Sequence, residues 1–159
     1  MMQAALDTLR HYLDRAEALI GAADDAALFH RPAPGMFIAA GQFATAIGMT
    51  GRDLLPAAGH KAPARPDELN RQTLVAYAQD MRAALAGIAP ADLTGKTIAH
   101  QAGFAALEQG IEEYLLRFAL PNMSFHLTAG YIALKQAGTA LGKADFDGLH
   151  AYPDGFSWE

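Results

Sequence analysis

Two polar side chains near the C-terminus, Asn122 and His126, have the spacing from which a binding site could be built. Residues four apart in a helix lie one turn from each other on the same face. Ala129 and Ala133 continue that face with small side chains. Small neighbours leave room beside an imidazole, which titrates near neutral pH and can accept or donate a proton. This face therefore predicts a polar pocket beside His126.

Other polar side chains could meet this face inside a helical protein. Gln42 lies on the expected second helix and His11 on the first. Helix bundles commonly build their sites from side chains on facing helices. We therefore name Gln42, Asn122 and His126 as the candidate pocket for a small-molecule ligand.

Each of these residues also has a purely structural interpretation. Asn122 follows Pro121 and could cap the start of a helix. His126 could be a core histidine with both ring nitrogens hydrogen-bonded, and Gln42 could be a packing or surface amide. His11 lies beside an apolar stripe and is expected to be exposed. The residue types alone leave these alternatives open.

The chain carries no recognisable motif for a metal site or a nucleophile. It has no cysteine and no HExxH, HxxxH or HxH pattern, whereas an open catalytic metal site needs about three His or carboxylate ligands. Neither serine lies in a G-x-S-x-G motif. A firmly bound cofactor is not expected, and His126 is the one weak candidate ligand. The remaining histidines are expected in solvent-facing loops: His30, His60, His100 and His150.

Composition limits the classes of partner. The 159 residues suit a single domain, 1–159, and a net charge of −5 without any Lys/Arg stripe argues against nucleic acid. No apolar run approaches the roughly 20 residues that cross a bilayer, which argues against a membrane protein. The N-terminus lacks the pattern of a signal peptide, so a cytoplasmic protein is expected.

Apolar periodicity predicts four amphipathic helices, which together describe an all-α four-helix bundle. The first covers 2–21 and the second runs from Met36 to about 57, with four glycines in or beside it that predict close packing or a bend. The third begins at Pro66 and ends at 88, and the last runs from Pro121 to about 137, closed by Gly138.

A long crossover precedes the last helix. Residues 94–100 and 103–108 resemble two extended pieces joined by a turn, although Ala and Glu favour helix as readily. A short helix over 110–118 should follow. The C-terminal tail contains four aromatic residues and is expected to wrap the bundle or meet another subunit: Phe146, Tyr152, Phe156 and Trp158.

The segment Leu-Pro-Asn-x-x-Phe-His-x-Thr-x-x-Tyr at 120–131, followed by Gly-x-x-x-Gly-Lys-x-Asp-Phe at 138–146, is long and specific. It resembles a bacterial family of uncharacterised proteins within the DinB/YfiT-like superfamily. The resemblance covers most of the chain, including the Pro-x-Met-Phe entry to the second helix.

This resemblance implies a bundle of up-down-down-up topology, a homodimer, and a site where many members hold a divalent metal with three histidines. Asn122 and His126 stand at the two HxxxH positions, and Gln42 stands nearest the histidine of the second helix. Amides are weak ligands, so the resemblance implies a degenerate metal site. The alternative it implies is a metal-dependent hydrolase or thiol-transferase-like enzyme with a weakly held divalent metal.

Overall fold

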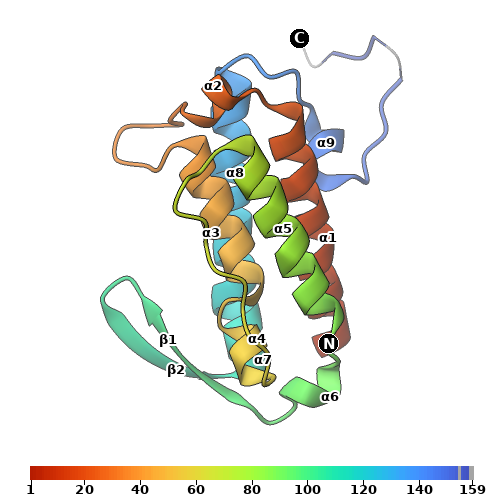
Figure 1. Ribbon diagram of the computed structural model, residues 1–159. Helices are drawn as coiled ribbons and strands as arrows, with labels where there is room; N and C mark the ends of the chain where they lie inside the picture. The colour runs from red at the N-terminus through yellow and green to blue at the C-terminus, as the bar shows by residue number, and fades with distance from the viewer. Residues whose placement is uncertain (154, 158–159) are drawn as a thin grey trace.

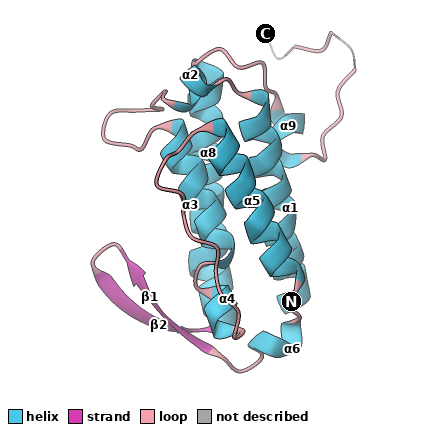
Figure 2. Cartoon of the chain, viewed as in Figure 1, coloured by secondary structure: helices cyan, strands magenta, loops and turns pink. Residues whose placement is uncertain are grey.

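Four long helices lie side by side in the computed structural model, which describes residues 1–153 and 155–157 (Figures 1 and 2). They are α1 (Met2–Ala22), α3 (Ala39–Gly51), α5 (Arg71–Ala86) and α8 (Leu120–Gln136). In chain order they run up, down, down and up in the view of Figure 1. The predicted four-helix bundle and its topology are therefore confirmed.

Helix α1 forms where the apolar stripe predicts it. Leu6, Leu9, Leu13 and Ile20 are fully buried, and their spacing of three, four and seven residues places them on one face. Charged side chains occupy the opposite face, where Asp14 and Glu17 pair with Arg82 of α5. The predicted range of 2–21 is confirmed to within one residue.

Helix α3 is shorter than its apolar pattern indicates. It begins at Ala39, ends at Gly51, and is followed by a separate turn, α4 (Leu54–Ala57). Its glycines allow the close packing that the sequence predicts. A Cβ on Gly51 would lie 2.5 Å from the Sδ of Met81 on α5.

The third helix begins later than Pro66, so that prediction is wrong. Asn70 accepts from the backbone N–H of Thr73, and the Thr73 hydroxyl accepts from the backbone N–H of Asn70. This reciprocal capping box satisfies two free donors and sets the start of α5 at Arg71. The preceding segment, 58–70, runs back along the bundle from the end of α4 (Figure 1).

The predicted hairpin is present, with strands that begin and end two to three residues later than expected, and it projects from one end of the bundle (Figure 2). After the short helix α6 (Pro90–Leu93), strand β1 (Thr97–Ala102) pairs antiparallel with β2 (Ala105–Gly110). Gly103 adopts a φ of 62° at the turn, a conformation that glycine takes without strain. His100 lies opposite Leu107 in this register.

The last helix does not begin at Pro121. Helix α7 (Ile111–Glu113), a π-helical turn (Tyr114–Ala119) and α8 follow one another without a break. The missing N–H and the ring of a proline disturb a regular α-helix, and the wider π turn immediately before Pro121 accommodates both. The expected separate helix at 110–118 is thus the first part of one long helix. Gly138, with a φ of 95°, follows its C-terminal end as predicted.

The beginning of the C-terminal tail packs on α1 through the short helix α9 (Lys143–Asp147). The ring of Phe146 contacts those of Tyr12 and Tyr131. His11 Nε2 lies 2.7 Å from the carbonyl oxygen of Asp147. His11 is therefore half-buried, whereas the sequence predicted that it would be exposed. Trp158 lies outside the described residues. A short helix, α2 (Asp25–Leu28), lies in the connection between α1 and α3.

Candidate functional site

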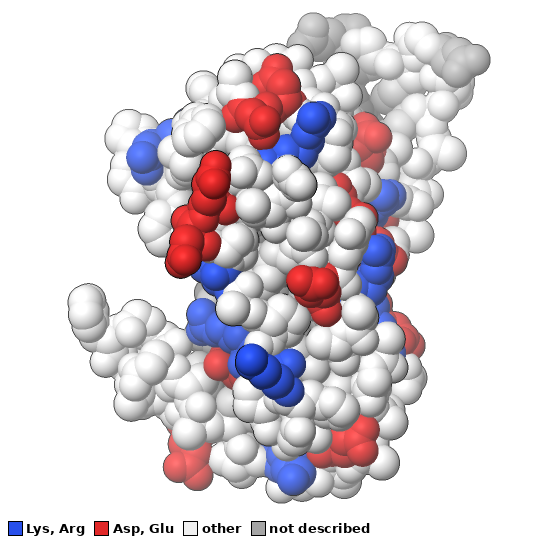
Figure 3. Space-filling view, viewed as in Figure 1, with Lys and Arg blue, Asp and Glu red and all other residues white. Residues whose placement is uncertain are grey.

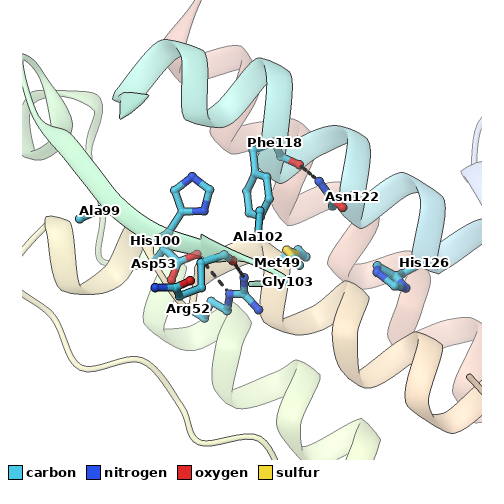
Figure 4. A pocket seen from close by; sticks show the side chains of 11 residues that line it. Met49, Arg52, Asp53, Ala99, His100, Ala102, Gly103, Phe118, Asn122 and His126 are labelled. Atoms are coloured by element: carbon cyan, nitrogen blue, oxygen red, sulfur yellow. Dashed lines mark hydrogen bonds and ion pairs between the residues drawn. The ribbon is translucent and has the colours of Figure 1, made fainter. Parts of the chain in front are cut away.

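A hollow of about 670 Å³ lies between the end of α3, strand β1 and helix α8. Met49, Arg52 and Asp53 form the α3 side, while Phe118, Asn122 and His126 face it from the last helix (Figure 4). The hairpin closes one end from Ala99 to Gly103. The surface is visibly indented between the hairpin and the body of the bundle (Figure 3). Its volume lies within the ordinary range for small-molecule sites.

His126 is held in one orientation by Gln42. Its Nδ1 lies 2.7 Å from Oε1 of Gln42, whose Nε2 donates to the carbonyl oxygen of Phe37 at 3.4 Å. Because that carbonyl can only accept, the oxygen of the amide faces the imidazole. Nδ1 therefore carries the proton, and Nε2 keeps its lone pair. None of the described residues hydrogen-bonds this Nε2.

The surroundings keep His126 neutral. Burial lowers the pKa of its imidazole, and the positive charge of Arg52 lowers that pKa further. Both effects disfavour the imidazolium ion. At neutral pH the site therefore presents a hydrogen-bond acceptor at Nε2 and a cation at Arg52.

Asn122 is not a helix N-cap, because it lies inside the continuous last helix. Its Nδ2 donates to the carbonyl oxygen of Phe118 at 2.7 Å. This bond gives a partner to a carbonyl of the π turn and leaves the Oδ1 of Asn122, at the wall of the hollow, free of hydrogen bonds to the described residues. Asn122 and His126 thus line the same space, one turn apart, as their spacing predicts.

The polar groups at the other end of the hollow are not evident from the sequence. Asp53 Oδ2 accepts from the hydroxyl of Tyr114 at 2.9 Å and from Nε of Arg52 at 3.1 Å. Burial raises the pKa of the Tyr114 hydroxyl, and the Asp53 carboxylate raises it further. The Nη2 of Arg52 lies 3.4 Å from the carbonyl oxygen of Gln101. An adjacent Arg-Asp pair after a helix carries no sequence signal of its own.

His100 is buried, contrary to the prediction that it faces solvent. Only 7% of its surface is exposed, and its Nε2 lies 2.8 Å from Oε1 of Gln109 on the paired strand. Its ring packs against those of Tyr114 and Phe118. The reason is tertiary, since the hairpin folds this face of β1 onto the last helix. The buried Nδ1 of His100 has no partner among the described residues.

A second, more apolar hollow of about 200 Å³ lies on the other side of His126. Met36, Phe37 and Phe125 line it together with Gln42 and His126. The three candidate residues therefore do not line one space. Asn122 belongs to the first hollow, Gln42 to the second, and His126 to both.

The candidate residues do not fit a divalent metal. Gln42 and the Nδ1 of His126 already bind each other, and the Nδ2 of Asn122 donates within its own helix, so the donors left are Nε2 of His126 and the weak amide oxygen of Asn122. Within residues 1–153 and 155–157, no three His, Asp or Glu side chains form a group that could hold an ion. One imidazole nitrogen and one amide oxygen are short of the three or four ligands, usually His, Cys or carboxylate, that a protein zinc site uses.

Comparison with known proteins identifies the family. The family described as "Domain of unknown function (DUF1993)" matches residues 1–147. The chain belongs to this family. A search of curated proteins found no match for this DUF1993 chain.

A solved structure has the same fold. The crystal structure of a DinB family member protein from Shewanella denitrificans superposes with a TM-score of 0.77 at 23% identity, covering 93% of this chain and 92% of the other. The DUF1993 chain therefore has the DinB-like fold, as the sequence resemblance implies. None of the described helices is both long enough and apolar enough to span a membrane.

Proposed function

We propose that this DUF1993 protein binds a small polar molecule in the hollow between α3, β1 and α8. The observation that carries the proposal is the neutral His126, which Gln42 holds with its Nε2 lone pair free. An imidazole fixed in one tautomer beside open space is prepared to accept a hydrogen bond from a ligand.

The other groups of the hollow complement a ligand with an acceptor or a negative charge. Nε of Arg52 is engaged by Asp53, and no described residue contacts its Nη1 at hydrogen-bond distance. Guanidinium N–H groups bind carboxylates well. Met49 and Phe118 supply an apolar wall. A ligand with a donor for His126 and an acceptor for Arg52 fits this lining.

A screen of small carboxylates, amides and hydroxy acids by ligand-observed NMR tests this proposal. Molecules that bind the parent should lose at least about tenfold in affinity with His126→Ala, because one hydrogen bond to the site is lost. His60→Ala is the matched control, since His60 is exposed and lies outside the hollow. The proposal fails if His126→Ala binds every hit as tightly as the parent does.

The same geometry supports a second candidate function, proton transfer. A neutral histidine with a depressed pKa and an oriented ring is suited to act as a general base at neutral pH. A ligand whose turnover follows the deprotonation of His126 would support this enzyme. Binding without any chemical change of the ligand would support the binding function only, and not the enzyme.

The weakly held metal of the alternative enzyme can be tested separately. Since the donors do not fit a divalent ion, Zn²⁺ or Ni²⁺ added to protein without a His-tag should leave the melting temperature within about 1 °C. A metal-dependent rise that disappears in His126→Ala would support the metal-dependent hydrolase or thiol-transferase-like enzyme instead.

We also propose the homodimer that the sequence resemblance implies. Phe104 at the tip of the hairpin is fully exposed and gives the chain an apolar contact point. Sedimentation equilibrium should show twice the mass of the chain, and Phe104→Asp should shift the equilibrium toward monomer. A parent protein that sediments as a monomer at all concentrations would refute this.

A further inference from the structure

Two exposed phenylalanines flank His126, one from the segment before α3 and one from α8 itself. The ring of Phe37, just before α3, stacks parallel to the imidazole at 6.3 Å, and the ring of Phe125 on α8 meets it edge-on at 5.1 Å. Their exposed fractions are 55% and 57%, so both keep large apolar surfaces uncovered. We call Phe37 and Phe125 the aromatic pair.

The backbone of Phe37 is tied to the side chain that orients His126. Gln42 bonds both to His126 and to the carbonyl oxygen of Phe37. Gly41 lies beneath Phe37, and a Cβ at Gly41 would come within 3.1 Å of the Cβ of Phe37. Exposed aromatic side chains held around a hollow favour a ligand group with a flat apolar surface.

The apolar hollow at the aromatic pair has room for one ring. Its volume is about 200 Å³, and a protein cavity of about 150 Å³ can take up benzene. Aromatic rings gain from stacked or edge-on contact with phenylalanine. This end of the site is therefore complementary to a six-membered ring.

The opposite end of the site carries the cation. Arg52 follows Gln42 by ten residues on helical backbone, which places its Cα about 15 Å further along the axis. The long arginine side chain can extend back over part of this distance. Asp53 already offsets some of its charge, so a monoanion matches this end better than a dianion. A carboxylate matches the planar guanidinium.

We propose that the ligand is an elongated aromatic monocarboxylate that spans both hollows. Its ring lies against Phe37 and Phe125, an N–H or O–H next to the ring donates to Nε2 of His126, and its carboxylate reaches Arg52. This inference rests on the proposed binding function and specifies the class of ligand.

A series of N-benzoyl peptides measures the length of the site. Benzoylglycine, benzoylglycylglycine and benzoyltriglycine share a ring and an adjacent amide N–H, and each added glycine extends the chain by about 3.5 Å. Calorimetry or ligand-observed NMR should show the two longer compounds binding at least about fivefold more tightly than benzoylglycine. Acetylglycylglycine lacks the ring and benzoylglycylglycinamide lacks the charge, and both should bind more weakly than benzoylglycylglycine.

Variants assign each end of the compound to its residues. Phe125→Ala and Phe37→Ala should weaken benzoylglycylglycine about tenfold and leave acetylglycylglycine unchanged. Arg52→Gln should weaken the acid and leave the amide unchanged. Phe29→Ala and Arg82→Gln are matched controls outside both hollows, and Phe29 is similarly exposed at 64%. These controls should bind like the parent.

Two results would overturn the inference without touching the proposed binding function. One is tight binding of acetylglycylglycine, lost in His126→Ala but independent of the aromatic pair, which would show a purely polar ligand. The other is that no benzoyl compound binds more tightly than about 1 mM, or that affinity is independent of length, while the broader screen still yields ligands that depend on His126. If no ligand in that screen depends on His126, the proposed function itself fails.

Discussion

The buried residues of helices α1 and α5 are mostly large, whereas many of those on α3 and α8 are alanine or glycine. Leu9 and Leu13 on α1, and Leu74 and Leu85 on α5, are buried to 1% exposure or less. On the other side, Gly130 of α8 receives the ring of Phe43 from α3. The α3–α8 pair has the most extensive contact in the bundle, followed by α1–α5.

The difference explains where the site lies. Leucines on two facing helices fill the space between them, and salt bridges from Arg82 to Asp14 and Glu17 cover the outside. Small residues allow the backbones of α3 and α8 to lie close together, and the buried Gln42 of α3 hydrogen-bonds His126 of α8 across this pair. The hairpin then encloses space that the helices do not fill.

The largest effect is expected on the leucine side. Leu9→Ala should lower the free energy of unfolding by about 3 kcal/mol, because Leu9 is fully buried and its removal leaves a cavity. Urea denaturation measures this. Leu149→Ala is the matched control, since Leu149 is 77% exposed and the change should stay within about 0.5 kcal/mol. Equal losses in the two variants would contradict this account of the core.

The contact between α3 and α8 should instead be destabilised by added side-chain volume. A Cβ on Gly130 would lie 3.0 Å from two atoms of the Phe43 ring, so Gly130→Ala should destabilise by about 2 kcal/mol through overpacking. Gly21→Ala on α1 meets nothing within 4 Å and should be neutral or stabilising by up to about 1 kcal/mol. If Gly130→Ala also stabilises, α3 and α8 are not in close contact there.

A smaller effect is expected at the base of the site. Tyr114→Phe keeps the packing of the ring but removes the hydrogen bond to Asp53, at a cost of about 1–2 kcal/mol. Tyr12→Phe is the control, because the Tyr12 hydroxyl donates no hydrogen bond to any described residue. The substitution also keeps the contact between this ring and Phe146. Unchanged stability in Tyr114→Phe would mean that water replaces the tyrosine without loss.

The smallest effect concerns the titration of His126. Its folded-state pKa is lowered, first by burial and then by Arg52, whereas the unfolded chain takes up this proton near pH 6.5. The stability linked to His126 is therefore fully present above about pH 6.5 and decreases as the pH falls. An NMR titration should show a partial rise of the His126 pKa in Arg52→Gln and none in Arg82→Gln. A pKa unchanged by Arg52→Gln would place that cation too far away to assist a ligand beside His126.

Local patterns predicted the elements but not all their ends. The stripe of Leu6, Leu9 and Leu13 is sufficient to predict α1, because burial of one helical face has a fixed period. Pro121 indicated a helix start, yet a π turn carries the helix through it. Pro66 was a plausible start as well, but the capping box of Asn70 and Thr73 satisfies the free backbone groups later in the chain.

The sequence by itself determined the helices of the bundle and the shared face of Asn122 and His126, because each depends on spacing within one element. It also determined the family, which is a property of the sequence along residues 1–147. Only the tertiary structure decided that Gln42 orients His126, that Arg52 and Asp53 join the site, and that His100 is buried. These facts depend on how far α3, the hairpin and α8 lie from one another. That separation is set by side-chain volumes on several elements at once, which no periodicity along a single helix records.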